Sequence, residues 1–187
     1  MAIAWGQVAF RVRDDDGNET TATWLAGESC NYEGILPLKN YRLRFTLNST
    51  GTTTASDGFH LWYSQNGVAY TRVGTGAGTA VNSSLSSNFA DGDNTTRQLT
   101  LFQTFDTTNL GMDEDGLITS QSITKAYSYE FEFCIQFAAL GSVNRPGDTF
   151  DFRIYLDDGV TPINTYTVTP RLTLYANCVD CIITNVG

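Results

Sequence analysis

Charged residues are scarce in this chain, and basic residues most of all. Its 187 residues include 11 lysines and arginines against 20 aspartates and glutamates, which gives a formal net charge of −9. Only 17% of the residues are charged, compared with roughly 25% in an average globular protein. Nucleic-acid binding needs a basic stripe that displaces counterions from phosphates, and anionic membranes attract similar clusters. The composition therefore predicts neither nucleic acid nor membrane as a partner.

Long apolar runs and helical patterns are also missing. No apolar run approaches the roughly 20 residues of a membrane span. Residues 1–10 lack the basic start and long apolar stretch of a secretory signal, so we expect synthesis in a cytoplasm. Apolar residues never keep a period of 3.6 over ten residues, so the sequence predicts no substantial helix.

Residues that carry catalysis are few. The single histidine, His60, lies in a strand-like pattern, and no Gly-x-Ser-x-Gly signature accompanies it. A hydrolytic triad would also need a nucleophile and an orienting carboxylate beside that histidine. We therefore interpret His60 as a structural or surface residue. The sequence predicts no catalytic residues and no cofactor, so the protein is not expected to be an enzyme.

Acidic turns recur at four places, namely 14–18, 91–94, 113–116 and 157–159. Calcium prefers several carboxylate and carbonyl oxygens, which is one interpretation of such turns. However, Asp, Asn and Gly also favour turns for conformational reasons, and none of the four has the spacing of an EF-hand. Nothing pairs two carboxylates across a cleft, as a glycosidase would require. The turn interpretation is favoured, and no metal site is predicted.

Four cysteines are present, at positions 30, 134, 178 and 181. Cys178 and Cys181 form a Cys-x-x-Cys pair, but a thioredoxin-like pair should precede a helix in an α/β fold. A four-cysteine zinc site would want two close pairs, whereas Cys30 and Cys134 are far apart in sequence. Reduced thiols and disulfides formed after release, within or between subunits, both remain open.

Alternation with a period of two is the dominant pattern. Residues 129–137 place large apolar side chains at every odd position and polar or small ones at every even position, including Cys134. Such a run predicts a long central strand whose apolar side needs a second layer. Asn66-Gly67 joins two alternating runs, 59–64 and 69–73, and predicts a tight hairpin. Further strands are predicted over 5–13, 20–25, 41–47, 99–105, 150–156, 165–168 and 171–174.

Two polar segments, 74–96 and 106–126, interrupt these strands and are expected to form surface excursions. Eight or more strands separated by loop signals predict an all-β fold, an antiparallel β-sandwich of the immunoglobulin-like or jelly-roll class. We expect residues 1–175 to form this one domain. Residues 176–187 would form a C-terminal tail that carries the Cys-x-x-Cys pair.

Several tracts resemble a β-sandwich module of tailed-bacteriophage virion structural proteins. The resemblance spans residues 5–175 and is carried by residues 7–24, 41–47, 61–67, 89–96, 148–159 and 166–170. It transfers no catalytic residues. A chain that consists of this module alone looks most like a capsid decoration, or cement, protein.

The resemblance implies a protein made in the host cytoplasm and located on the exterior of the virion capsid. Its partners would be the major capsid protein and copies of itself. Such proteins act as trimers or bind as monomers, and a homotrimer is favoured here. The alternative is a tail-associated carbohydrate-binding or adhesion module, in which Trp5, Trp62, Tyr63 and Tyr70 would stack on sugars. The same four residues also suit core and cross-strand packing.

The tail contains Cys178, Cys181, Ile182, Ile183 and Val186. Each apolar side chain is worth about 1.5–3 kcal/mol when fully buried. We therefore expect the tail to dock against its own sandwich or a neighbouring subunit, where the cysteines would lock the contact as a disulfide. A short final strand that completes the sheet is the alternative.

Overall fold

The computed structural model describes residues 3–51, 54–76, 78–100, 103–108 and 110–176, and within them the chain forms thirteen strands and no helix. No helix in these residues is therefore long and apolar enough to cross a membrane. The strands are β1 (Ala4–Asp14), β2 (Tyr32–Ile35), β3 (Asn40–Thr50), β4 (Ala55–Gln65), β5 (Thr71–Arg72), β6 (Val81–Ser83), β7 (Thr104–Phe105), β8 (Met112–Asp113), β9 (Leu117–Ile123), β10 (Tyr127–Phe137), β11 (Thr149–Leu156), β12 (Thr165–Tyr166) and β13 (Arg171–Leu174).

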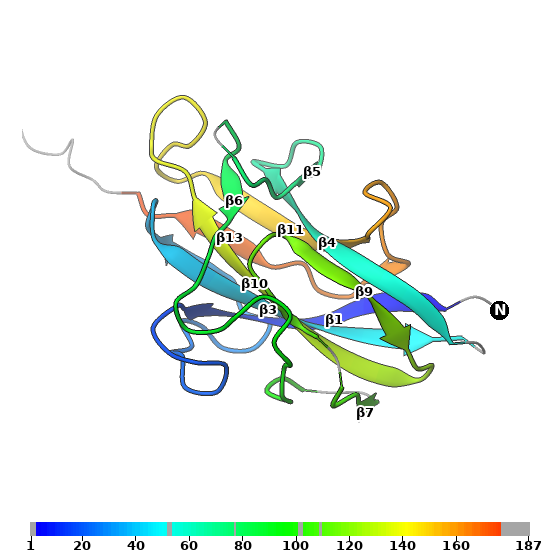
Figure 1. Cartoon of the computed structure of the whole chain (residues 1–187). Coiled ribbons are helices and arrows are strands. Elements are labelled where there is room, and N and C mark those ends of the chain that lie inside the picture. The colour runs from blue at the N-terminus through cyan, green and yellow to red at the C-terminus, as the bar shows by residue number, and fades with distance from the viewer. Residues whose placement is uncertain (1–2, 52–53, 77, 101–102, 109, 177–187) are drawn as a thin grey trace, which may run out of the picture.

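Two sheets pack face to face (Figure 1), which confirms the predicted β-sandwich. The first sheet has the order β12-β1-β3-β10-β6, and β7 and β8 also pair with β10. The second has the order β2-β13-β11-β4-β5, and β9 pairs with β4. The long strands are antiparallel to one another as predicted, but both sheets are mixed, because the short strands β2, β7, β8 and β12 pair in parallel.

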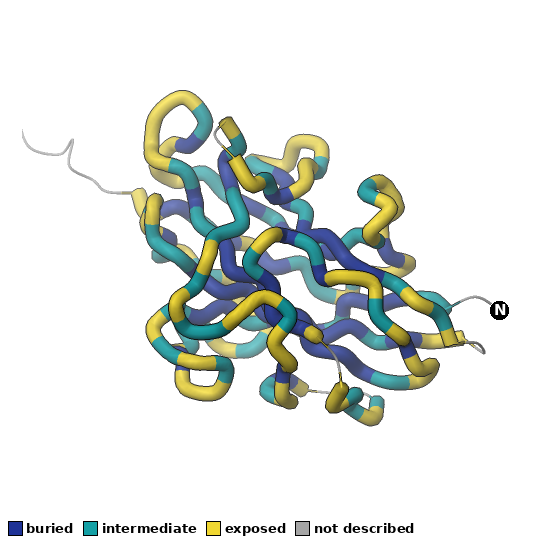
Figure 2. Tube along the Cα trace, in the orientation of Figure 1, coloured by how far each residue is buried: buried dark blue, intermediate teal, exposed yellow. Residues whose placement is uncertain are grey.

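The core lies between the two sheets and is rich in aromatic rings. Every odd residue from Tyr129 to Phe137 is fully buried, as the alternation predicted. Phe131 meets Phe59 of the other sheet with ring centroids 5.0 Å apart, and Phe137 meets Phe150 at the same distance. Figure 2 shows the buried stretches along the long strands and the exposed ones in the connecting loops. The alternation of β10 therefore specifies the interface between the layers.

Two residues considered for sugar stacking belong to this core. Trp5 is 2% exposed, and its ring packs edge-to-face against Phe59 with the ring centroids 4.9 Å apart. Tyr63 is 6% exposed, and its hydroxyl accepts a hydrogen bond from the backbone nitrogen of Ala80. The packing interpretation is therefore correct for both, and neither is available to a ligand.

The polar segments are more structured than the sequence suggested. Residues 81–83 form β6, which pairs with β10, and residues 117–123 form β9, which pairs with β4. The description of 74–96 and 106–126 as surface excursions is therefore wrong in part. Pairing to a long neighbouring strand supplied the order that local polarity did not reveal.

Two strand predictions also need correction. Of residues 20–25, only Trp24 makes a bridge, to Arg13. The chain before Trp24 forms turns instead of a strand. The Asn18 side chain stabilises these turns by accepting hydrogen bonds from the backbone nitrogens of Thr20 and Thr21. Of residues 99–105, the strand covers Thr104–Phe105, and residues 101–102 lie outside the described part of the chain.

Candidate functional site

The outward face of the second sheet places Trp62 between two arginines. Leu61 and Tyr63 point into the core, so Trp62 of β4 points outward and is half-buried. Its direct cross-strand neighbours are Arg72 of β5 and Arg153 of β11. The three side chains therefore form a row across three adjacent strands.

Tyrosine rings complete this row. The Tyr155 ring stacks on Trp62 with centroids 4.5 Å apart and an angle of 17° between the planes. The Tyr70 ring lies 6.3 Å from that of Tyr155. The Arg153 guanidinium carbon lies over two rings, 4.7 Å from the centroid of Tyr70 and 4.6 Å from that of Tyr166. The six residues of the aromatic–arginine face are Trp62, Tyr70, Arg72, Arg153, Tyr155 and Tyr166.

Backbone features hold the two outer tyrosines in place. Asn66 and Gly67 have φ values of 52° and 76°, the positive values expected of the predicted tight turn, and the chain then returns past Tyr70 to β5. The Tyr166 hydroxyl donates to the carbonyl of Ile154 at 2.6 Å. Burial raises the pKa of both Tyr70 and Tyr166, so both phenols are neutral donors at physiological pH.

The electrostatics of this face are unusual for an acidic chain. Arg171 pairs with Asp151 at 2.7 Å. Arg72 and Arg153 form no ion pair with any carboxylate of the described residues. The buried Nε1 of Trp62 and the buried Nε of Arg153 likewise have no hydrogen-bond acceptor there. The face therefore offers cationic and neutral donors beside aromatic rings.

The outer face of the first sheet carries a buried ion network instead. Its residues are Arg13, Arg42, Arg44, Glu19, Glu130 and Glu132. Glu132 lies 2.6 Å from Arg13 and 2.8 Å from Arg44, and all three side chains are 0% exposed. Burial by itself would lower the pKa of Arg44, but the carboxylates of Glu132, Glu130 and Glu19 outweigh it and raise that pKa. For Arg13, in contrast, burial lowers the pKa of the guanidinium although Glu132 opposes that shift.

Loops from distant parts of the sequence cover this network. The backbone nitrogens of Gln98 and Leu99 donate to Glu130 at 2.9 and 2.8 Å. The Thr96 nitrogen and hydroxyl donate to Glu19, and Arg44 donates to the Thr96 carbonyl. Ion pairs of this kind hold loops on a sheet. One buried atom of the network, Nη1 of Arg42, has no hydrogen-bond partner among the described residues.

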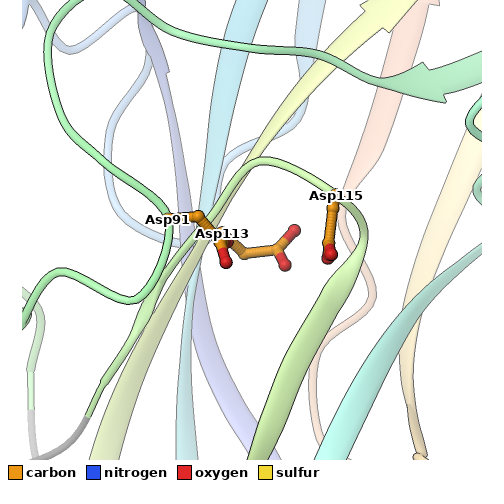
Figure 3. Close-up of side chains that lie close together, drawn as sticks. All are labelled: Asp91, Asp113 and Asp115. Atoms are coloured by element: carbon orange, nitrogen blue, oxygen red, sulfur yellow. The ribbon is translucent and has the colours of Figure 1, made fainter.

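Two of the four acidic turns meet in space (Figure 3). The carboxylates of Asp91, Asp113 and Asp115 each place an oxygen within 4.8 Å of the others. Asp113 is fully buried and accepts hydrogen bonds from the nitrogens of Gly116 and Leu117 at 2.8 and 2.7 Å. Burial, together with the charges of Asp115 and Asp91, raises the pKa of Asp113 to about 8. With one oxygen from each carboxylate, calcium would need further carbonyl or water oxygens to reach the about six to eight ligands that it takes.

The remaining sequence predictions fall in different places. Cys178, Cys181, Ile182 and Ile183 lie outside the described residues. His60 is 4% exposed, and its Nδ1 lies 2.9 Å from the carbonyl oxygen of Gly116, so it has a structural role.

Cys30 is an exposed free thiol and Cys134 a buried one. Burial raises the pKa of Cys134, so its thiol is protonated and unreactive. The even position of Cys134 does face away from the core between the sheets, but the covering loops bury it.

Sequence reasoning singled out Trp62 and Tyr70 of the aromatic–arginine face but missed the other four residues. Arg153 and Tyr155 alternate with buried Phe152 and Ile154, so the pattern contained their outward orientation. It could not reveal which strand lies next to them. No protein-family model matches this chain, and no curated protein matches it either.

Proposed function

We propose that the protein is a non-enzymatic virion structural protein, a capsid decoration protein that binds the outside of a phage head shell and stabilises it. The proposal rests on the resemblance to phage virion modules. One structural observation supports it, namely the place where three of the resembling tracts meet.

Residues 7–24, 41–47 and 89–96 converge on the buried ion network. Arg13 lies over the Trp24 ring at 4.6 Å, and Arg42 lies over the Phe89 ring at 5.4 Å. Glu19 of the first tract joins Arg44 of the second at 2.7 Å. The residues that distinguish these tracts thus build a frame that fixes loops to a sheet. A frame of this kind suits a structural module rather than a catalytic one.

The proposal includes contacts with the major capsid protein and a homotrimeric assembly. The strands at the ends of the two sheet orders are short, with two residues in β5, two in β12, three in β6 and four in β2, although β9, which pairs with β4, has seven. Short edges limit strand-to-strand association, so loops and chain ends are the natural contact regions.

The tail remains part of the proposal as a subunit contact. The chain approaches residue 177 beside an apolar end of the sandwich, because the Tyr175 nitrogen donates to the Ile35 carbonyl. Leu36, Leu38 and Tyr175 are 47%, 64% and 50% exposed there. We propose that Ile182 and Ile183 contact a neighbouring subunit, with Cys178 and Cys181 able to lock that contact.

Purified virions provide the direct test. We expect mass spectrometry to find the protein in mature particles and electron microscopy to place it on the head exterior. Light scattering of the isolated protein should give a trimer. Deletion of residues 177–187 should leave the fold intact and weaken binding to shells. Absence from mature particles, or a location on the tail alone, would contradict the decoration role.

A further inference from the structure

We infer that the aromatic–arginine face is a binding site for an acidic carbohydrate, a polysaccharide segment whose sugar rings carry carboxylates. The inference concerns the outer face of the second sheet. It goes beyond the proposed attachment to a capsid, which involves chain ends and loops.

The charge of the face indicates an anionic ligand. Three arginines, Arg72, Arg153 and Arg171, lie on strands β5, β11 and β13 against one aspartate, Asp151. Asp151 already pairs with Arg171 through two hydrogen bonds of 2.7 and 2.8 Å. Two guanidinium groups therefore lack a counter-charge among the described residues, although the chain as a whole has a net charge of −9. A guanidinium is the side chain that best matches the planar geometry of a carboxylate.

The spacing of these two arginines indicates an extended ligand. They flank Trp62 on opposite sides, one strand away in each direction. Neighbouring strands lie about 4.8 Å apart, so the two backbones are about 10 Å apart. Two guanidinium groups on opposite sides of Trp62 can each hold a separate carboxylate, and a chain of sugars with a carboxylate on more than one ring supplies them.

The rings between the arginines indicate a sugar rather than a bare anion. Trp62, Tyr155 and Tyr70 present half-buried aromatic surface, and the electron-rich face of such a ring attracts the polarised C–H groups of a pyranose. The buried Nε1 of Trp62 and Nε of Arg153 have no acceptor among the described residues, and the exposed Arg72 is the donor that a carboxylate reaches directly.

Calorimetry and tryptophan fluorescence on the full chain test this inference. The probes are an oligogalacturonate, a neutral dextran of similar length and poly-L-glutamate. We expect binding of the oligogalacturonate and none of the dextran. Loss of one charge-assisted contact in Arg153→Gln should weaken that binding about tenfold, with a smaller loss in Arg72→Gln. The matched control is Arg97→Gln, an exposed arginine on a loop of the other sheet, which should bind as the unmodified protein does.

Three results would overturn the inference. One is an absence of binding to the oligogalacturonate. Another is equal affinity in Arg153→Gln and the unmodified chain. The third is equally tight binding of poly-L-glutamate, since the face would then recognise acidic peptides by charge alone. Trp62→Phe keeps an aromatic ring and should lose the fluorescence response while the chain stays folded. Shell binding is measured separately on particles, so either proposal can fail without the other.

Discussion

The outer faces of the two sheets use arginine in opposite ways. On the first sheet, Arg13, Arg42 and Arg44 are 0% exposed, and carboxylates from β10 and a covering loop surround them. On the second sheet, Arg72 is exposed and Arg153 is half-buried, and neither pairs with a carboxylate of the described residues. Loops close the first face, whereas on the second face Arg72 is exposed and the Arg153 guanidinium lies over the Tyr70 and Tyr166 rings.

This difference shows that alternation assigns a side but not a role. An arginine that points away from the core becomes part of the frame when loops cover it and bring carboxylates to it. It stays available to a partner when nothing covers it. The cost of removing a charge should therefore differ greatly between the two faces.

The largest effect is expected for Glu132→Gln. This substitution removes the carboxylate shared by Arg13 and Arg44, both at 0% exposure. Breaking a buried pair leaves uncompensated charge, so the free energy of unfolding should fall by about 3–5 kcal/mol. Urea denaturation measures it. The matched control is Asp151→Asn, which breaks the exposed pair with Arg171 and should cost no more than about 1 kcal/mol. Equal effects of the two substitutions would remove the contrast between the faces.

A second effect concerns Asp113, a buried carboxylate without an arginine partner among the ion pairs of the described residues. Its pKa in the folded state is about 8, above the ordinary value of 3.8. The folded protein thus binds a proton that the unfolded chain releases, so this contribution to stability is complete below about pH 4, declines as pH rises toward 8, and is constant above.

Asp113→Asn tests this linkage because an amide does not titrate. Relative to the unmodified protein, the variant should gain on the order of 3–4 kcal/mol between pH 5 and pH 8. At pH 5 the variant and the parent also differ in stability for another reason. One carboxylate oxygen of Asp113 becomes an NH2 group in the variant, and that group faces one of the two backbone N–H donors. Urea denaturation at the two pH values gives the difference. A gap between variant and parent that stays constant with pH would contradict the raised pKa.

A smaller effect is expected for Arg153→Gln. The guanidinium lies over the Tyr70 and Tyr166 rings, and such contacts are worth about 0.5–1 kcal/mol each at accessible sites. Thermal denaturation should therefore show a modest loss. A loss as large as that of Glu132→Gln would mean that Arg153 belongs to the frame, which would weaken its assignment to a binding surface.

The smallest effect is expected for Arg72→Gln. Arg72 is exposed, lies on a strand of two residues and has no ion-pair partner in the described chain. Its replacement should change the free energy of unfolding by no more than about 0.5 kcal/mol. The same denaturation experiment measures it. If Arg72→Gln leaves the stability unchanged but weakens oligogalacturonate binding, the arginines of the second sheet serve binding, whereas those of the first sheet serve stability.

The sequence by itself determined the layered β fold and its core. The alternation of residues 129–137 identified the buried side of β10, and Asn66-Gly67 identified a tight turn, since both signals are local properties of the backbone. The same local signals did not decide whether Trp5 and Tyr63 bind a ligand or pack in the core. Their burial depends on the opposite sheet.

Only the tertiary structure decided which outward side chains are covered and which strands are neighbours. The burial of Glu132 requires loops from distant parts of the chain, and the meeting of Asp91 with Asp113 joins two turns that look alike in sequence. The row of Arg72, Trp62 and Arg153 arises from the register of β4 with β5 and β11. An alternation with a period of two predicts which side of a strand each residue faces. Strand register and loop coverage depend on contacts between residues far apart in the chain, and a local sequence pattern does not contain that information.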